Sequence, residues 1–213
     1  MIEIYDSYSK SYKEVSNKNI NMYVCGITTS DFCHLGHAFS SVSFEILDRF
    51  LTSKGYKVLR VQNFTDVDDK IITKSLSENM SPEEVSKKYI EAFFEDMDAL
   101  GVKRASSYPK ATEEIGNIIN FIKKLEEKEF TYQIEGSVYF RVSKFKNYGK
   151  LSSRNLADSI SGTRINENLN KESNEDFALW KSSKLNEPFW DSPWGKGRPG
   201  WHIECSAMSK KFL

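Results

Sequence analysis

Two apolar segments separated by an amphipathic one, near the start of the chain, restrict the fold more than any other feature. The first, "INMYVCG" at 20–26, ends in glycine and predicts a buried strand that runs into a turn. Apolar residues at near-helical spacing predict a helix over 37–55, and "YKVLRVQNF" at 56–64 predicts a second strand. Strand, helix and strand so close together predict a βαβ unit with parallel strands and a right-handed crossover.

The segments after this unit predict three more helices and a hairpin. The helices are expected over 66–79, 81–100 and 112–130. The second has a strong start signal in "SPEE" at 81–84, with Ser81 as N-cap, a proline in the first turn and Glu84 closing a capping box. A hairpin is expected over 130–145 with its turn near Glu135-Gly136, and exposed polar loops over 146–176.

Composition narrows the class of protein without indicating a function. Of 213 residues, 39% are hydrophobic and 28% charged, which is typical of a globular protein. The 30 basic and 30 acidic residues cancel, so the overall charge does not indicate nucleic-acid binding, although a local basic face is compatible with it. We find no apolar run of membrane-spanning length and no signal-peptide pattern. Three unevenly spaced cysteines do not suggest a disulfide framework, so a cytoplasmic location is predicted.

Two histidines and a glycine, "HLGH" at 34–37, lie where the first strand joins the first helix. Helix N-termini bind phosphates because their amides are unpaired and the helix dipole favours negative charge. Gly36 allows close approach, and His34 and His37 would point the same way and donate hydrogen bonds to a phosphate. A string this short is more often two surface histidines and a turn, but the βαβ context favours a nucleotide site. Because the G-x-G-x-x-G fingerprint is absent, an ordinary dinucleotide enzyme is not expected.

The three cysteines leave the question of a metal site open. Cys25 ends the first predicted strand, and Cys205 follows "GWHIE", a strand-like run near the end of the chain. Neither belongs to a C-x-x-C pair, and a buried cysteine is commonly just a small apolar residue, as we expect for Cys33. If Cys25 and Cys205 share a metal ion, they must meet at the ends of neighbouring strands.

Four segments give the chain a resemblance to the cysteinyl-tRNA synthetases: "MYVCGITTSDFCHLGHAFS", "VQNFTDVDDKI", "FALWK" and "SPWGKGRPGWHIECSAMS". They occur in the family's order and roughly its spacing, and "HLGH" resembles the class I synthetase signature with leucine for the commoner isoleucine. The resemblance implies an α/β fold, a Rossmann-type (HUP-like) parallel-sheet catalytic domain with an inserted connective α+β subdomain. The implied catalytic domain covers 1–112, the insertion 113–195, and at 196–213 the chain would return to the catalytic domain and its sheet.

The resemblance also implies the reaction of a cysteine–tRNA ligase. The carboxylate of cysteine would attack the α-phosphate of ATP, supplied with Mg²⁺, and the cysteinyl adenylate would then acylate tRNA(Cys). His34, Gly36 and His37 would bind ATP, with both histidines catalytic. The implied protein is a monomer with no membrane partner. The residues implied for binding the amino acid are Gly26, Thr65 and Trp201, of which Trp201 is equally compatible with core packing.

The same resemblance implies a zinc ion. Cys25 and Cys205 match two of its protein ligands, and its open position would take the substrate thiolate. A borderline-soft ion prefers thiolate to hydroxyl, so one bond can reject serine without editing. Three further acids, Asp66, Asp68 and Asp69, could suggest a hard-metal site but are interpreted as helix N-terminal charges.

Several features of the family are not found in this sequence. The histidine and glutamate that complete the family's zinc site, the K-M-S-K-S loop and the anticodon-binding part are expected beyond Leu213, and "AMSKK" at 207–211 comes too early to be that loop. These 213 residues are therefore expected to be the N-terminal portion of a longer enzyme, inactive alone and binding zinc weakly.

Two other functions stay open. One is the ligase that joins cysteine to an amino sugar in mycothiol synthesis, which resembles these synthetases in its zinc and ATP sites but uses no tRNA. The other is a truncated, non-catalytic paralogue that acts as a binding module. The intact His34, His37, Cys25 and Cys205 argue against the second.

Overall fold

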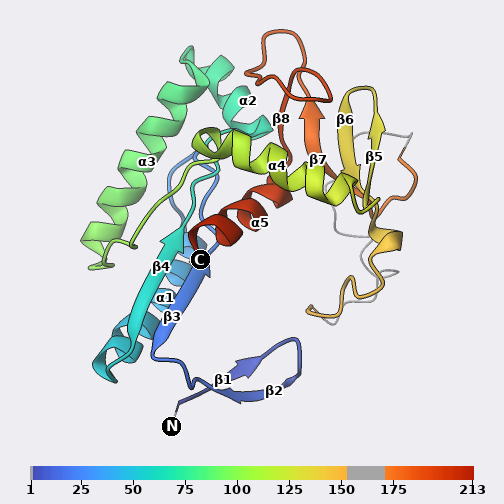
Figure 1. Ribbon diagram of the computed structural model, residues 1–213. Helices are drawn as coiled ribbons and strands as arrows, with labels where there is room; N and C mark the ends of the chain where they lie inside the picture. Colours follow the sequence, from blue (N-terminus) through green and yellow to red (C-terminus); the bar gives the residue numbers. More distant parts are fainter. Residues whose placement is uncertain (1, 153–170) are drawn as a thin grey trace.

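The first unit of the fold is the predicted βαβ, seen in a computed structural model that describes residues 2–152 and 171–213 (Figure 1). It consists of β3 (Asn19–Val24), α1 (Leu35–Ser53) and β4 (Lys57–Gln62). The two strands pair in parallel, which confirms the prediction. One face of α1 closes a small core over this pair, formed by Met22, Val24, Leu51 and Tyr56.

A third extended segment, residues 106–111, lies parallel to β4 and widens the sheet. The Ser106 amide donates to the Arg60 carbonyl at 2.7 Å, and the Gln62 amide donates to the Ser107 carbonyl at 3.1 Å. The bonds therefore alternate between the two backbones, as they do in a parallel ladder. β4 is thus an inner strand, with polar residues at its carboxyl end close to both neighbours.

Two helices connect β4 to this segment, and both were expected from the sequence. They are α2 (Asp69–Glu78) and α3 (Pro82–Ala99), drawn in green in Figure 1. The predicted start of α3 is confirmed, because the Ser81 hydroxyl accepts from the Glu84 amide while the Glu84 carboxylate accepts from the Ser81 amide. Asn79 ends α2 in the left-handed conformation, with φ of 54°.

The second half of the chain forms an antiparallel sheet with helices packed on it. The predicted hairpin is confirmed, with its turn at Glu135 and Gly136, both at positive φ as a two-residue hairpin turn requires. The order across the sheet is β5-β6-β7-β8. The loops predicted over 146–176 lie partly outside the described residues. The elements are η1 (Thr112–Glu114), α4 (Ile115–Glu126), β5 (Thr131–Ile134), β6 (Ser137–Phe140), η2 (Val142–Lys144), β7 (Phe177–Ser182) and β8 (Gly197–Pro199).

The last element, α5 (Trp201–Phe212), corrects a prediction. The run "GWHIE" was expected to be a strand and 196–213 to return to the sheet, but from Trp201 the chain is helical. The reason is packing: Ile203 and Ala207, four residues apart, lie in the same core as α4 and β7, whereas Met208 packs against Val67 and Ala111 of the parallel unit. A helix satisfies both cores, and a strand would point alternate residues away from each of them.

A short hairpin precedes the parallel unit and reaches toward the antiparallel sheet (Figure 1). It pairs β1 (Glu3–Asp6) with β2 (Ser11–Glu14). At its turn, the Lys150 ammonium donates to the Tyr8 hydroxyl at 3.2 Å, so the hairpin touches both halves of the chain. In the described part of the chain, we find no helix with the length and apolarity that crossing a membrane requires. The domain boundaries at 112/113 and 195/196 stay predictions.

Candidate active site

Gly26 places Cys25 at the carboxyl end of β3. The Gly26 amide donates to the Asn63 side-chain oxygen at 2.9 Å. A β-carbon at position 26 would lie 1.5 Å from the Asn63 carbonyl oxygen, so only glycine allows the two strand ends to approach this closely. Asn63 itself is buried. The turn after β3 is therefore fixed against the end of β4, and Cys25 faces outward from it.

Two cysteines that are distant in sequence meet at this point. The sulfur atoms of Cys25 and Cys205 lie 3.3 Å apart, and the Cys205 sulfur lies 3.6 Å from the Asn63 side-chain oxygen. The expectation that they would meet at the ends of neighbouring strands is wrong, because Cys205 comes from helix α5. The hydrogen bond between the thiols lowers the pKa of Cys25 to about 7 and raises the pKa of Cys205 above its usual range.

This pair fits two positions of a tetrahedral zinc site. Both cysteines are free thiols. Two sulfurs that bind one zinc at about 2.3 Å are separated by about 3.7 Å, which is close to the distance found here. Within residues 2–152 and 171–213, no group of three or more cysteine, histidine or acidic side chains could surround an ion. Cys25 and Cys205 are thus a partial donor set, and zinc stays a prediction.

The two histidines of "HLGH" form one unit at the start of α1. His34 is the N-cap, and its Nδ1 accepts from the Gly36 amide at 3.0 Å, while the His37 Nδ1 accepts from the His34 amide at 3.4 Å. Their rings stack with centroids 3.8 Å apart. Because each Nδ1 accepts a hydrogen bond, each neutral ring carries its proton on Nε2. Burial, with His34 and Lys70 close by, lowers the pKa of His37, so this ring is neutral at pH 7.

A cavity of about 440 Å³ lies between the β3–α1 connection and α2. Its lining is mixed in charge: Lys70 and Lys74 line it together with Asp31 and Asp69, and the Lys74 ammonium pairs with the Asp31 carboxylate at 3.3 Å. Lys70 is also one of the groups that lower the pKa of His37. The predicted ATP-binding histidines therefore lie near a cavity lined by both cations and carboxylates, and ATP binding there stays a prediction.

Thr65 and Trp201, both predicted to bind the amino acid, lie in different environments. Thr65 is buried at the end of β4, and its hydroxyl donates to the Glu204 carboxylate at 2.5 Å. Trp201 is 46% exposed, so it is not a core residue. It lies four residues before Cys205 on α5, which places both on one face of the helix.

The acidic residues and the third cysteine near this site have structural partners. Asp68 is the N-cap of α2 and Asp66 accepts from the Thr112 amide and hydroxyl. Asp69 pairs with Lys181 and Arg198. Cys33 packs beside the core of Ile27 and Phe64, and burial raises the pKa of its thiol to about 11. The rejected segment "AMSKK" lies within α5.

Sequence reasoning missed two buried polar residues, Asn63 and Glu204. Among the described residues, Asn63 Nδ2 and Glu204 Oε1 are buried without a hydrogen-bond partner. Burial raises the pKa of Glu204 well above its usual value. Their signal in the sequence is a polar residue inside an apolar run, in "VQNF" and in "WHIEC". Both connect the predicted ligands: Asn63 touches Gly26 and Cys205, and Glu204 binds Thr65.

Solved structures with the same fold define a class. A Mycobacterium tuberculosis methionyl-tRNA synthetase, solved with methionyl-adenylate, matches with a TM-score of 0.63 at 11% identity, over 91% of this chain and 47% of that one. A putative arginyl-tRNA synthetase from Campylobacter jejuni gives 0.50 at 16% identity, over 61% and 39%. At these identities the likeness concerns the fold, which is the Rossmann-type fold of class I synthetases. The predicted fold class is confirmed.

Sequence comparison then gives the family within that class. The family model described as tRNA synthetases class I (C) catalytic domain matches residues 11–213, and the chain belongs to this family. Relatives named cysteine–tRNA ligase are 51% identical in Methanococcus maripaludis and 49% identical in Thermococcus kodakarensis, each aligned over 100% of this chain and 45% of the relative. A third, from Thermodesulfovibrio yellowstonii, is 50% identical over 96% and 43%. The chain therefore spans less than half the length of these relatives.

Proposed function

We propose that this protein is a cysteine–tRNA ligase that activates cysteine with ATP and transfers it to tRNA(Cys). The observation that supports this most is the approach of Cys25 and Cys205 to 3.3 Å, although 180 residues separate them, at the strand end that leads to His34 and His37. The thiol pair suits a substrate that carries a thiol. The nearby helix N-terminus suits ATP, whose phosphate the carboxylate of the same substrate would attack. The names of the relatives support the same substrate.

Cys25 and Cys205 would hold the zinc ion. Bound there, zinc would supply a soft Lewis acid that favours a substrate thiolate over a hydroxyl and so separates cysteine from serine. The chain's own contribution is to hold both sulfurs in place. Gly26 and Asn63 fix the position of Cys25, and the packing of α5 on two cores fixes that of Cys205.

His34 and His37 would act on the phosphates of ATP. Each ring presents a protonated Nε2, because its Nδ1 accepts from the backbone of the helix start. Two such donors at a helix N-terminus stabilise the charge that develops on the α-phosphate as the carboxylate attacks it. The stacked rings cannot turn independently, so the donors are held ready before ATP binds. Mg²⁺ would accompany ATP as part of the substrate.

Gly26, Thr65 and Trp201 would bind the amino acid between these two groups. The Trp201 ring would cover the small substrate and exclude water, and the Thr65 hydroxyl would contact it from the end of β4. The attack of the substrate carboxylate on ATP would then need little motion, because the end of β3 and the start of α1 belong to one connection. A monomeric state and a cytoplasmic location stay predictions.

The test is cysteine-dependent exchange of pyrophosphate into ATP by the full-length protein, followed by charging of tRNA(Cys). Cysteine should support exchange and serine should not. Cys25→Ser should lower exchange by about 100-fold or more and release zinc, since even outer-shell changes at metal sites cost 10- to 100-fold.

The matched control is Cys33→Ser, which makes the same chemical change outside the pair, beside the core of Ile27 and Phe64, and should change exchange by less than about twofold. Equal exchange with serine and cysteine, or transfer to an amino sugar in place of tRNA, would contradict the proposal.

A further inference from the structure

Glu204, the residue before Cys205 on α5, has a buried carboxyl group to which the proposed function gives no role. The residue is 1% exposed. One carboxyl oxygen, Oε2, accepts from the Thr65 hydroxyl at 2.5 Å, whereas among the described residues the other, Oε1, has no hydrogen-bond partner. A buried acceptor without a partner costs stability, and native proteins tolerate such costs chiefly at functional sites. Glu204 is therefore a candidate for a role beyond packing.

The backbone of Thr65 is held by the connection that leads from β3 to α1. Its amide donates to the Ile27 carbonyl at 3.0 Å, and its carbonyl accepts from the Thr29 amide at 3.1 Å and from the Thr29 hydroxyl at 3.2 Å. Because both backbone groups are engaged, a ligand at Thr65 would meet the side-chain hydroxyl. The orientation of that hydroxyl is set by its hydrogen bond to Glu204.

This hydrogen bond also determines what the Thr65 oxygen can offer to a ligand. A hydroxyl has one hydrogen and two lone pairs, so an oxygen that has donated its hydrogen can only accept. Of the two charged ends of an amino acid, the ammonium donates hydrogen bonds and the carboxylate accepts them. Thr65 in this orientation therefore suits the ammonium and leaves the carboxylate free to react.

We propose that Glu204 is a positioning residue that orients the Thr65 hydroxyl, so that its oxygen accepts from the α-ammonium of the bound cysteine. Glu204 and Cys205 are consecutive, so the first turns of α5 set both ends of the substrate. Cys205 lies at the thiol, and Glu204 acts on the ammonium through Thr65. The inference rests on the proposed function, because that function assigns cysteine as the substrate.

The experiment uses calorimetry on the zinc-loaded, full-length protein to measure binding of cysteine and of two analogues that each lack one charged end. Cysteamine keeps the thiol and the ammonium, whereas mercaptopropionate keeps the thiol and the carboxylate. Glu204→Met removes the acceptor at similar length. It should weaken binding of cysteine and cysteamine about tenfold or more, the scale of a hydrogen bond to a charged group. Binding of mercaptopropionate should stay the same, because that analogue has no ammonium.

Two further variants distinguish positioning from a purely structural role. Glu204→Gln keeps an oxygen that can accept from Thr65, so it should restore most of the cysteamine binding. In the double variant Glu204→Met/Thr65→Val, the two losses should not add, because both substitutions remove the same hydrogen bond. In pyrophosphate exchange, Glu204→Met should raise the KM for cysteine with little change in kcat or in the KM for ATP, since the ammonium contact persists through the reaction.

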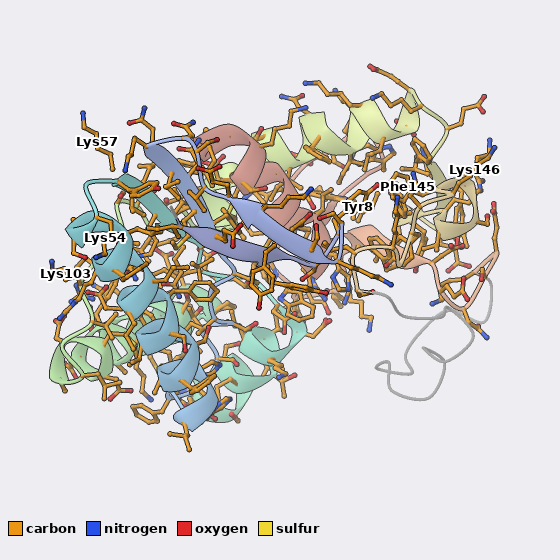
Figure 2. All side chains as sticks on the ribbon, turned by 90° about the horizontal axis from the view of Figure 1, so that it is seen from below. Tyr8, Lys54, Lys57, Lys103, Phe145 and Lys146 are labelled. Carbon is orange, nitrogen blue, oxygen red and sulfur yellow. The ribbon has the colours of Figure 1, made fainter. Side chains whose placement is uncertain are left out.

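Matched controls change residues that do not contact Thr65. Glu114→Met removes another buried acid that contacts α5, where it accepts from the Lys211 ammonium at 2.7 Å. Lys57→Gln changes an exposed side chain at the start of β4, which Figure 2 shows on the same side of the molecule as Lys54. Both variants should bind cysteamine as the parent protein does.

Three results would overturn the inference. Glu204→Met could weaken both analogues equally, it could weaken neither, or Glu114→Met could show the same selective loss of cysteamine binding. Failure of the unmodified protein to exchange pyrophosphate with cysteine would instead overturn the proposed function.

Discussion

The absence of a side chain at Gly26 determines where the thiol pair lies. The backbone of β3 passes so close to that of β4 that a β-carbon would overlap the Asn63 carbonyl. That contact orients both Cys25 and the side chain of Asn63, which lies near the Cys205 sulfur. The position of the thiol pair therefore depends on a residue that has no functional group.

Gly26→Ala should lower the free energy of unfolding by about 1–3 kcal/mol, the usual cost of overpacking. Urea denaturation measures it. Gly116→Ala is the matched control, because a β-carbon there meets nothing within 4 Å and position 116 lies in helix α4. The control should be neutral or stabilising by up to about 1 kcal/mol. Equal effects of the two substitutions would show that the close approach at Gly26 does not matter.

The hydrogen bond between Thr65 and Glu204 should be measurable as stability. Thr65→Val removes the hydroxyl and leaves the Glu204 carboxyl buried without its partner, at a cost of about 1–3 kcal/mol. Thr65→Ser keeps the hydroxyl and should recover most of that loss in the same urea titration. A loss of stability with Thr65→Ser but none with Thr65→Val would show that methyl packing rather than the hydrogen bond stabilises this site.

At the scale of elements, α2 is joined to the antiparallel sheet by charge. Asp69 in its first turn pairs with Lys181 of β7 and Arg198 of β8. Burial raises the pKa of Asp69, but these two cations outweigh burial and hold it below its usual range. A depressed carboxyl pKa contributes stability above the unfolded pKa, and that contribution is lost as the pH falls through the folded value.

Asp69→Asn should therefore lower the free energy of unfolding at pH 7 by about 1–2 kcal/mol, between the values for exposed and buried pairs. The difference from the parent protein should persist down to about pH 4 and narrow as the pH falls further. Asp98→Asn is the control, since its pair with Arg104 is exposed, and should cost less than about 1 kcal/mol. A pH-independent difference would argue against the ionic origin.

Elements with local signals were predicted well, and α5 was not. The start of α3 is encoded within four residues, Ser81 to Glu84, so no distant part of the chain was needed to find it. In α5 the apolar residues Ile203, Ala207 and Met208 have helical spacing, but the short run "WHIE" is equally compatible with a strand. The helical conformation of α5 is decided by its contact with two cores whose other residues lie far away in the sequence.

At the scale of the whole molecule, α5 connects the two halves. Its Ile203 and Ala207 belong to the core beneath the antiparallel sheet, and its Met208 to the core with Val67 and Ala111. Because these contacts join distant parts of the chain, only part of the candidate site could be predicted from the sequence. The motifs around His34 and Cys25 are visible in sequence, but the contacts of Asn63 with Cys205 and of Glu204 with Thr65 exist only once α5 has docked.

Met208→Ala should lower the free energy of unfolding by about 2–5 kcal/mol, because the side chain is fully buried. If α5 couples the halves, tryptophan fluorescence and far-ultraviolet circular dichroism should still report one shared urea midpoint, shifted to lower urea. Leu185→Ala, at a side chain 91% exposed, should change stability by less than about 0.5 kcal/mol. Two separate midpoints in the parent protein would show that the halves unfold independently.

The separation of the two cysteines in the sequence also determines when they can meet during synthesis. Cys205 is added to the growing chain 180 residues after Cys25. At about 5–20 residues per second, the ribosome needs roughly 9–36 s to make that stretch. During this interval the nascent chain carries the first thiol without the second, so the thiol pair can form only after Cys205 has been made and α5 has docked.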